Sequence, residues 1–548
     1  MASSSGYDFS QIYHSSTLAF SPGTTFLASS HHNRLIVRSS ATLAIVRTWL
    51  CRAASSPPAS SSSSSTSRKS DSKEEFEIDT LLWSADSLYL LAFSSEARTA
   101  WVFGLAEDGS GDSGEIARIG GEGVEGLVRV EWSRTGRDVL AWSDFGLRLS
   151  IFSLSTGNAG VIQYPKSPTG CECLFLLPAS SSTSRDSYDT GHTYSPTGRY
   201  LAVAERHSGK DHIGLYDTAA EYQLVRSFPL QTTDVQGISW SPCGKWLAVV
   251  DSHLSFSMCI HSPIGPLLSH FSPTSPGFSP TSTSSSTSTP SAEDPGLGIR
   301  TTAWAPGGRF IAIGGWDGKV RVLESDGWRC VAVMTWGTRT VEKNATVWLD
   351  RLPVPCVLPT ARADFTKATP RAGILQLAFD NDATLLLIRL ETSPHVVHIH
   401  TFLPTPNAAS PVITHLTSLI FTYPVKTAKW SPSGARRLAV TTRSGAVYFW
   451  DAEGAWVDDG AEEARGGMME GVGVPSRVEF VAHDVQWAPD GTSLAVRDKW
   501  KFCILYETED DQDGPSRWDG VEGLTHVSEE DEEVDESFAG FNMPVLAA

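Results

Sequence analysis

One hydrophobic pattern recurs along this chain: a short alternating strand that ends in an aromatic residue, a small polar turn, and a strand that is apolar throughout. In residues 238–251, "ISWSPCGKWLAVVD", Ile238 and Trp240 show the two-residue period of a strand. Ser-Pro-Cys-Gly then favours a type I turn, and "WLAVV" is typical of a strand covered on both faces. Each copy of the pattern therefore predicts a β-hairpin inside a stack of sheets.

The hairpin occurs nine times, which indicates a repeat architecture whose units bury their apolar faces against one another. A third and a fourth strand follow several hairpins, as at 445–451 and 222–230, and Trp450-Asp451 ends one of the third strands. Four strands per unit with such a Trp-Asp pair are typical of WD-repeat propeller blades. The aromatic residues that anchor the nine units are Phe20, Trp83, Trp132, Tyr194, Trp240, Trp304, Phe379, Trp430 and Trp487.

The anchors lie 46 to 75 residues apart, too far for blades of roughly 40–45 residues. Low-complexity inserts account for the excess, since about 44 residues per unit remain without them. The predicted fold is all-β: a propeller of about nine four-stranded blade units over residues 7–506. The inserts, which we expect to be disordered, are 53–75, 107–122, 178–191, 271–297 and 337–370, and an acidic disordered tail occupies 507–548.

The two ends of the chain predict how the ring closes. The ninth unit has a hairpin and a third strand but no fourth, and a spare segment, 7–15, precedes the first unit. We expect this N-terminal segment to complete the last blade, because a closed ring leaves no unpaired strand edge. Nine blades exceed the usual four to eight, so one ring plus a partial second is the alternative to a single ring.

Charge is concentrated at the C-terminal end. Between residues 507 and 536, fourteen acidic residues face Arg517 alone, a net charge of −13 out of −19 for the chain. Composition leaves two interpretations open, a solvated tail and a docking tail for a basic partner. The acidity argues against nucleic acid as a partner and against direct contact with other polyanionic surfaces, including microtubules. Neither a transmembrane run nor a signal peptide is visible, so we expect an intracellular, cytoplasmic protein with no membrane partner.

The inserts 53–75, 271–297 and 337–370 fall between an outer strand and the next inner strand. In a propeller these links share a face with the hairpins that join the second and third strands of each blade. Ser/Thr/Pro-rich segments bury too little apolar surface to order themselves. Either these loops have drifted in length, or this face recruits partners under the control of Ser-Pro phosphorylation.

Motifs that would carry chemistry are weak. No catalytic constellation or cofactor-binding motif emerges, so we expect no enzyme activity, cofactor, metal or small-molecule substrate. His398 and His400 share one face of a strand, but no third ligand is near in sequence, which favours ordinary strand histidines. Trp316 and Asp317 indicate a hairpin turn; the Trp is a candidate partner contact, and a turn packed on its neighbour is the alternative.

The order and wording of the units resemble the WD-repeat-containing protein eight family, the WRAP-type proteins of centrosomes and fungal spindle pole bodies. The most specific stretches are "WSADSLYLL" and "AERHSGKD", which generic WD repeats do not use. The resemblance covers nearly the whole chain, but the Ser-rich inserts and the acidic tail depart from the family pattern and nothing transfers to them. It is carried by residues 8–38, 78–91, 162–166, 198–217 and 314–323.

This resemblance implies a non-enzymatic scaffold. Family members act with a coiled-coil microtubule-anchoring protein and, in fungi, a minus-end-directed kinesin, and tether spindle microtubule minus ends at the pole. The expected location is then the cytoskeleton, at the spindle pole body or centrosome, with microtubules reached indirectly. Two rivals stay open: a translation-initiation propeller with ribosomal or initiation-factor partners, and an enzyme with a quinone cofactor in a propeller funnel.

The stretch "AERHSGKDH" at 204–212 joins the second and third strands of the fourth unit. Glu205, Arg206, Lys210 and Asp211 should therefore lie on the same face as the long inserts. They are candidate partner-binding residues, with a structural salt-bridge turn as the alternative. If they bind a partner, charge reversal at Arg206 and Lys210 should weaken co-purification of the anchoring protein without changing thermal stability.

Overall fold

The computed structural model describes the greater part of the chain. The described residues are 6–52, 76–105, 114–120, 126–166, 191–275, 278, 297–336, 345–350, 358–362, 372–404, 410–453 and 467–508. The predicted insert 53–75, and nearly all of 178–191 and of the acidic tail, lie outside these residues.

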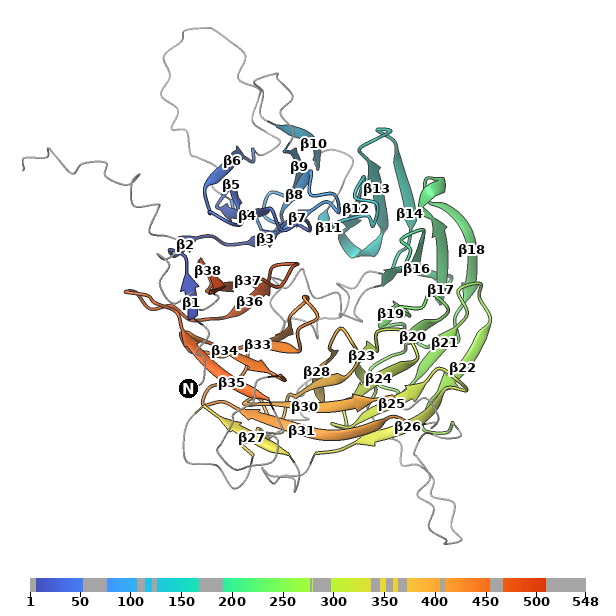
Figure 1. Cartoon of the computed structure of the whole chain (residues 1–548). Helices are drawn as coiled ribbons and strands as arrows, with labels where there is room; N and C mark the ends of the chain where they lie inside the picture. Colours follow the sequence, from blue (N-terminus) through green and yellow to red (C-terminus); the bar gives the residue numbers. More distant parts are fainter. Residues whose placement is uncertain are drawn as a thin grey trace, which may run out of the picture.

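Within the described ranges the strands form nine sheets, the blades of a propeller. Figure 1 shows the blades following one another around a ring in chain order, from dark blue to red. Blade 1 consists of β3 (Leu18–Phe20), β4 (Phe26–His31), β5 (Arg34–Ser39) and β6 (Ile45–Leu50). Blade 2 consists of β7 (Thr80–Trp83), β8 (Tyr89–Ser94), β9 (Thr99–Gly104) and β10 (Glu115–Ile119). Blade 3 consists of β11 (Leu127–Trp132), β12 (Asp138–Ser143), β13 (Arg148–Ser153) and β14 (Ala159–Gln163).

The next three blades repeat this four-stranded order. Blade 4 consists of β15 (His192–Tyr194), β16 (Tyr200–His207), β17 (Lys210–Asp217) and β18 (Gln223–Pro229). Blade 5 consists of β19 (Gly237–Trp240), β20 (Leu247–Val250), β21 (Met258–His261) and β22 (Leu267–Phe271). Blade 6 consists of β23 (Ile299–Trp304), β24 (Phe310–Gly315), β25 (Val320–Glu324) and β26 (Arg329–Met334). Short 3-10 turns occur at η1 (Asp144–Gly146) and η4 (Thr218–Ala220).

The last three blades include two five-stranded sheets. Blade 7 consists of β28 (Ile374–Phe379), β29 (Leu385–Leu390), β30 (Val396–Leu403) and β31 (Val412–Ile420), to which β27 (Thr346–Leu349) adds a parallel strand. Blade 8 consists of β32 (Thr427–Trp430), β33 (Arg437–Thr441), β34 (Ala446–Asp451) and β35 (Met468–Gly473). Blade 9 consists of β36 (Asp484–Trp487), β37 (Ser493–Arg497) and β38 (Lys501–Thr508), completed by β1 (Gly6–Phe9) and β2 (Tyr13–His14).

All nine predicted hairpins are the first two strands of a blade, and eight of their turns share one hydrogen-bond pattern, while the turn at Ser431 is one residue longer. In the Ser241 turn, Gly244 N–H donates to Ser241 O (2.9 Å) and Trp246 N–H donates to Ser241 Oγ (3.0 Å). The fourth turn residue always has a left-handed φ, which is the reason that glycine fills six of the nine positions. These residues are Thr24, Ser87, Gly136, Gly198, Gly244, Gly308, Ala383, Gly434 and Gly491.

The anchor tryptophans tie neighbouring blades together. The indole N–H of Trp83 donates to Ala19 O in the preceding blade (3.0 Å), and that of Trp132 donates to Leu82 O (2.9 Å). The same bond joins Trp430 to Ala378 O and Trp487 to Lys429 O, both at 3.1 Å. Each such bond contributes about 0.5–1.5 kcal/mol. In these four blades the anchor is thus an interblade link, whereas the indole N–H of Trp240 donates to Gly244 O in its own turn (3.0 Å).

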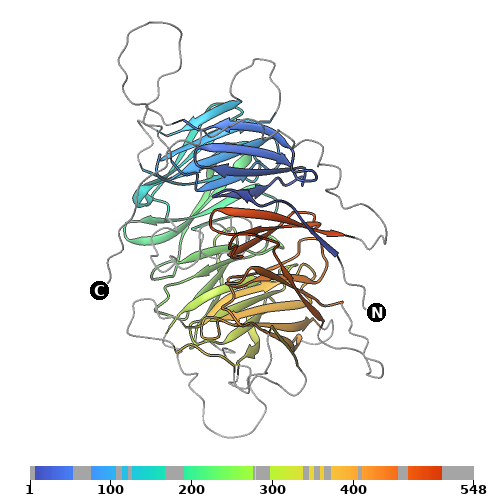
Figure 2. The same cartoon turned by 90° about the vertical axis from the view of Figure 1, so that its left-hand side faces the viewer.

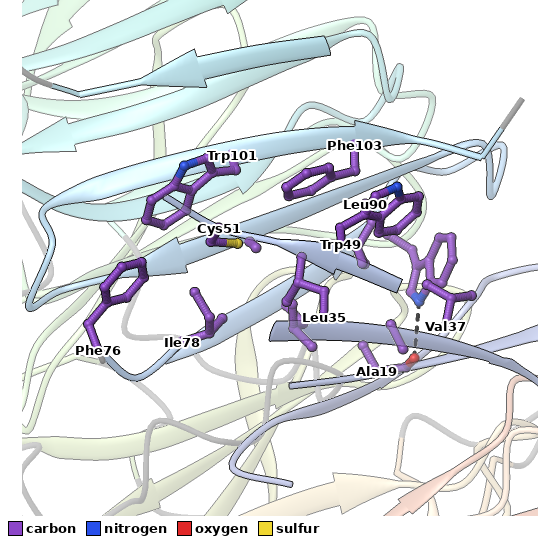
Figure 3. Packing of buried hydrophobic residues seen from close by; sticks show 14 residues of the cluster. Ala19, Leu35, Val37, Trp49, Cys51, Phe76, Ile78, Leu90, Trp101 and Phe103 are labelled. Atoms are coloured by element: carbon purple, nitrogen blue, oxygen red, sulfur yellow. Dashed lines mark hydrogen bonds between the residues drawn. The ribbon is translucent and has the colours of Figure 1, made fainter. Parts of the chain in front are cut away.

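Nine clusters of buried apolar side chains lie between successive blades. Between blades 1 and 2, Trp49 stacks on Phe103 with ring centroids 5.0 Å apart, and Figure 3 shows this cluster with the bond that ends on Ala19. The ninth cluster joins blade 9 to blade 1 through Phe502 and Leu27. Every neighbouring pair of blades is therefore packed, and the nine blades form a single ring.

The N-terminal strand closes this ring, as the sequence predicts. β1 pairs antiparallel with β38 from Gly6↔Thr508 to Phe9↔Leu505, and Figure 2 shows the dark blue strand against the red ones. Tyr7 stacks on Phe449 of blade 8, with ring centroids 5.2 Å apart. The third strand of blade 9 therefore has no open edge. This is the closure predicted from the missing fourth strand of the ninth unit.

The structure corrects the extent of several predicted inserts. Segment 107–122 contains β10, segment 337–370 contains β27, and segment 271–297 begins with a core residue, Phe271, and contains a second, Phe278. The ninth blade continues to Thr508, two residues past the predicted boundary. Ile116 of β10 is 50 % exposed, so this outer strand has only one buried face and a weak hydrophobic pattern.

Candidate interaction surface

The turns between the second and third strands, and the links between blades, lie on one face of the ring, which we call the upper face. On blade 4, β16 and β17 form its longest described hairpin, paired from Tyr200↔Asp217 to His207↔Lys210. The two-residue turn 208–209 has positive φ at both residues, as a type I′ turn requires. The chain at 164–166 extends the inner edge of this hairpin, where Lys166 N–H donates to Ala204 O (2.7 Å).

Two of the four predicted residues on this hairpin are buried. Glu205 is 3 % exposed and accepts hydrogen bonds from the Tyr216 hydroxyl and from His207 Nε2 (2.6 Å). Asp211 is also 3 % exposed and accepts from Val235 N–H (2.8 Å). The prediction of partner contact is corrected for Glu205 and Asp211, because both carboxylates are used within the fold.

The other two, Arg206 and Lys210, are exposed. Arg206 Nη1 lies 3.2 Å from Asp234 Oδ1, and Lys166 Nζ lies 2.5 Å from the same oxygen and 2.9 Å from Asp211 Oδ2. Partial burial alone would raise the pKa of Asp234, but Lys166 and Arg206 hold it below its usual value. The hairpin thus has features of both predicted alternatives. Its buried carboxylates belong to a salt-bridge network, as a structural turn requires, and its two cations are exposed, as a partner contact requires.

Trp316 and Asp317 form the equivalent turn of blade 6. The Arg300 guanidinium lies over the Trp316 ring (4.6 Å to its centroid), and Asp317 Oδ2 pairs with Arg321 Nη2 (2.8 Å). A Cβ at Gly373, which precedes β28, would lie 2.6 Å from Trp316 Cα. These contacts favour the alternative of a packed turn, since both side chains are only partly exposed.

Sequence reasoning missed a second exposed region of the upper face. The turn 498–500 joins β37 to β38 and carries Trp500, 58 % exposed, beside exposed Lys499. We call Arg443, Arg477, Val478, Lys499 and Trp500 the blade 8–9 surface. The sequence signal for this exposed aromatic residue is "DKWK" at 498–501. It places a tryptophan between two lysines at a position where the repeat pattern predicts a polar turn.

The structure brings a third histidine to the predicted pair. His415 of β31 stacks on His400 (4.7 Å between ring centroids), and Ser418 Oγ lies 3.0 Å from both His398 Nδ1 and His415 Nε2. Burial lowers the pKa of His400 to about 3 and that of His398 well below its usual value, so both are neutral at pH 7. Within the described residues, no three His, Cys, Asp or Glu side chains are grouped as metal ligands.

The described part of the chain also holds no helix that could cross a bilayer. A closed ring of four-stranded blades with Trp-anchored hairpins defines the fold class: this chain forms a β-propeller. Residues 288–323, which reach into blade 6, match the family model "WD domain, G-beta repeat".

Over 519 residues the chain is 28 % identical to the WD repeat-containing protein WRAP73 of Mus musculus, a match that covers 89 % of this chain and 92 % of that protein. It is 26 % identical over 148 residues to an uncharacterized WD repeat-containing protein of Schizosaccharomyces pombe, covering 27 % of this chain and 26 % of that one. The solved C-terminal WD40 domain of Sif2 aligns with 91 % of this chain and 99 % of its own at 9 % identity, with a TM-score of 0.44, too low to support an inference.

Proposed function

We propose that this protein is a non-enzymatic scaffold of the spindle pole body or centrosome. With a coiled-coil anchoring protein and a minus-end-directed kinesin, it tethers the minus ends of spindle microtubules. The observation that carries the proposal is the similarity to WRAP73 over 92 % of that protein's length, together with the stretches that resemble the WRAP-type family. The proposed location is therefore the cytoskeleton at the microtubule-organising centre.

The architecture supports a binding role. A ring of nine blades offers a broad upper face built of turns held by regular sheets, and binding residues are commonly placed on loops that a rigid scaffold positions. Charge supports indirect contact with microtubules, because a chain of net charge −19 is repelled by an acidic filament. An adaptor protein would remove this repulsion.

Live imaging tests the location. A fluorescent fusion of the full chain should concentrate at the two spindle poles through mitosis and should stay there after microtubules are depolymerised. A signal that is uniform in the cytoplasm at every stage would contradict the proposal.

A pull-down tests the blade 4 hairpin as the anchoring surface. Lys210 is exposed and its charge is not part of the network of Lys166, Asp211 and Asp234. Lys210→Glu should therefore reduce recovery of the coiled-coil anchoring protein at least fivefold while thermal stability stays unchanged. Lys245→Glu is the matched control, since Lys245 is exposed in a first-to-second-strand turn on the opposite face. Equal recovery with both variants would remove this hairpin from the interface.

A translation-initiation scaffold is the second candidate, favoured by the nine-blade ring, because wide many-bladed rings also occur in that setting. Sedimentation of a cell extract on a sucrose gradient separates the two functions. Movement with small ribosomal subunits, lost when the subunits are dissociated, would favour the second candidate over the first.

A further inference from the structure

The blade 8–9 surface is one continuous piece of the upper face, built from three segments. The link 474–483 is bonded to the turn of blade 8, where Val474 N–H donates to Gly445 O and Ala482 N–H donates to Ser444 O, both at 2.9 Å. At its other end, His483 N–H donates to Arg497 O (2.8 Å), next to the turn of blade 9. The two ends of the link are therefore held against the turn of blade 8 and beside the turn of blade 9.

The apolar side chains on this floor are exposed on rigid backbone. Trp500 is 58 % exposed and Val478 is 63 % exposed. The turn that carries Trp500 is fixed on both sides, because Asp498 N–H donates to Lys501 O (2.8 Å) and Ser15 N–H donates to Trp500 O (3.0 Å). Because this turn is already ordered, binding at Trp500 does not require a loop to be fixed.

Cations surround these apolar residues in a chain that is otherwise acidic. Arg443, Arg477 and Lys499 are exposed and outnumber the one exposed anion of the link, Glu479. Asp498 is partly buried and accepts a hydrogen bond from Lys499 N–H (2.7 Å). Burial lowers the pKa of His483, and nearby cations, Lys499 and Arg443 among them, lower it further, although Asp498 acts in the opposite direction. An occupant of this surface must therefore bring negative charge together with an apolar residue.

We propose that residues 529–541 of this same chain dock on the blade 8–9 surface. Seven acidic residues lie between 529 and 536, and Phe538 and Phe541 follow them directly. The acidic run is the complement of the cations, and the two phenylalanines are the complement of Trp500 and Val478. Docking covers this part of the upper face, so the segment competes with any partner that binds there.

The connection is long enough. The strand β38 begins beside Trp500 on the upper face and ends eight residues later at Thr508, a rise of about 27 Å. The twenty residues 509–528 span at most about 66 Å when extended, more than the return path requires. Tethering also gives the segment an effective concentration on the order of millimolar, which a separate acidic partner would have to exceed.

Photocross-linking within the purified full chain tests the proposal independently of any spindle partner. With p-benzoylphenylalanine in place of Val478, irradiation should give a cross-link to the peptide that contains residues 529–541. Its yield should be unchanged by tenfold dilution, since the contact lies within one chain. The same group in place of Leu254, a 72 % exposed residue on the upper turn of blade 5, is the control and should give at most one tenth of that yield.

Two further variants identify the contacts. Phe538→Ala with Phe541→Ala, and separately Glu530→Lys with Glu533→Lys, should each reduce the cross-link at least fivefold while the thermal unfolding midpoint stays the same. A yield that falls on dilution would assign the surface to a second copy of the chain. Cross-links to other segments only, or equal yields at Val478 and Leu254, would overturn the proposal.

Discussion

The β16–β17 hairpin of blade 4 and the blade 8–9 surface lie on the same face of the ring, yet they use charged residues in opposite ways. On the hairpin, Asp211 and Glu205 are buried and their charges are satisfied by neighbours such as Lys166. On the blade 8–9 surface, Arg443 and Lys499 are exposed. The density of charge along a sequence therefore does not indicate which charges remain available to a partner.

The segments that lie beside each region explain why its charges are buried or exposed. The hairpin is enclosed by the segment 164–166 on one side and by the link 230–236 on the other, and each contributes a charged side chain. The link over blades 8 and 9 instead contributes Arg477 and Glu479, both exposed, and exposes Val478 between them. One region thus uses its charged side chains within the fold, and the other leaves them exposed.

The largest expected effect is on stability at the hairpin. Asp211→Ala removes a partner of Lys166, whose side chain is 18 % exposed, and leaves Val235 N–H without its acceptor. Breaking such a buried pair should lower the free energy of unfolding by about 3 kcal/mol, measured by chemical denaturation. The control is Asp382→Ala, because Asp382 is exposed in a lower-face turn. A loss below about 1 kcal/mol would mean that the network contributes little.

The next effect is on contact at the blade 8–9 surface. Arg443→Glu with Lys499→Glu reverses two exposed charges, so intramolecular cross-linking from position 478 should fall at least tenfold, which corresponds to about 1.4 kcal/mol. The free energy of unfolding should change by less than about 0.5 kcal/mol, because neither residue is buried. Loss of stability comparable to that of Asp211→Ala would abolish the contrast between the two regions.

A smaller effect is expected from pH. Burial and neighbouring cations hold the pKa of His483 below its usual value, and an acidic segment placed beside it raises that pKa. Docking then takes up protons and is favoured by lower pH, so the cross-link yield should rise about threefold between pH 7.5 and 5.5. His483→Asn should remove this rise. A yield that falls over the same interval would show that His483 does not face the docked segment.

The smallest expected effect is on the free energy of unfolding when Arg206 of the hairpin is replaced. Arg206→Ala should lower the free energy of unfolding by only about 0.5 kcal/mol, because the side chain is 48 % exposed and water screens its pairing with Asp234. Compared with Asp211→Ala in the same denaturation experiment, it separates the exposed layer of the network from the buried one. Equal losses for the two variants would place Arg206 inside the structural network.

Local patterns account for the parts of the fold that sequence predicts well. The nine hairpins follow from anchors such as Trp83 and from turns that require a left-handed fourth residue, and the missing fourth strand of blade 9 predicts closure by the N-terminal segment. The strand β27 was missed because it pairs in parallel with β31, about seventy residues away. Such pairing leaves no periodic signal near β27 itself.

The candidate site shows the same division. That Arg206 and Lys210 lie on an upper-face turn follows from blade order alone, and the structure places both there. The burial of Glu205 does not follow from its own neighbours in sequence, since it depends on the hydroxyl of Tyr216 across the hairpin. Trp500 was not predicted, because the turn "DKWK" lacks the glycine that marks the turn at Trp316 and Asp317.

The pairing of β1 with β38 has a consequence for the order of synthesis. Residues that meet in this sheet are separated by about five hundred positions, so ring closure must wait until the ribosome has produced nearly the whole polypeptide. Bringing such distant ends together costs about 5–6 kcal/mol of chain entropy by the logarithmic loop rule. Eight blades are thus present before the seam can form, and a nascent chain that terminates before blade 9 would leave uncovered the apolar face of blade 8, which includes Val447 and Phe449.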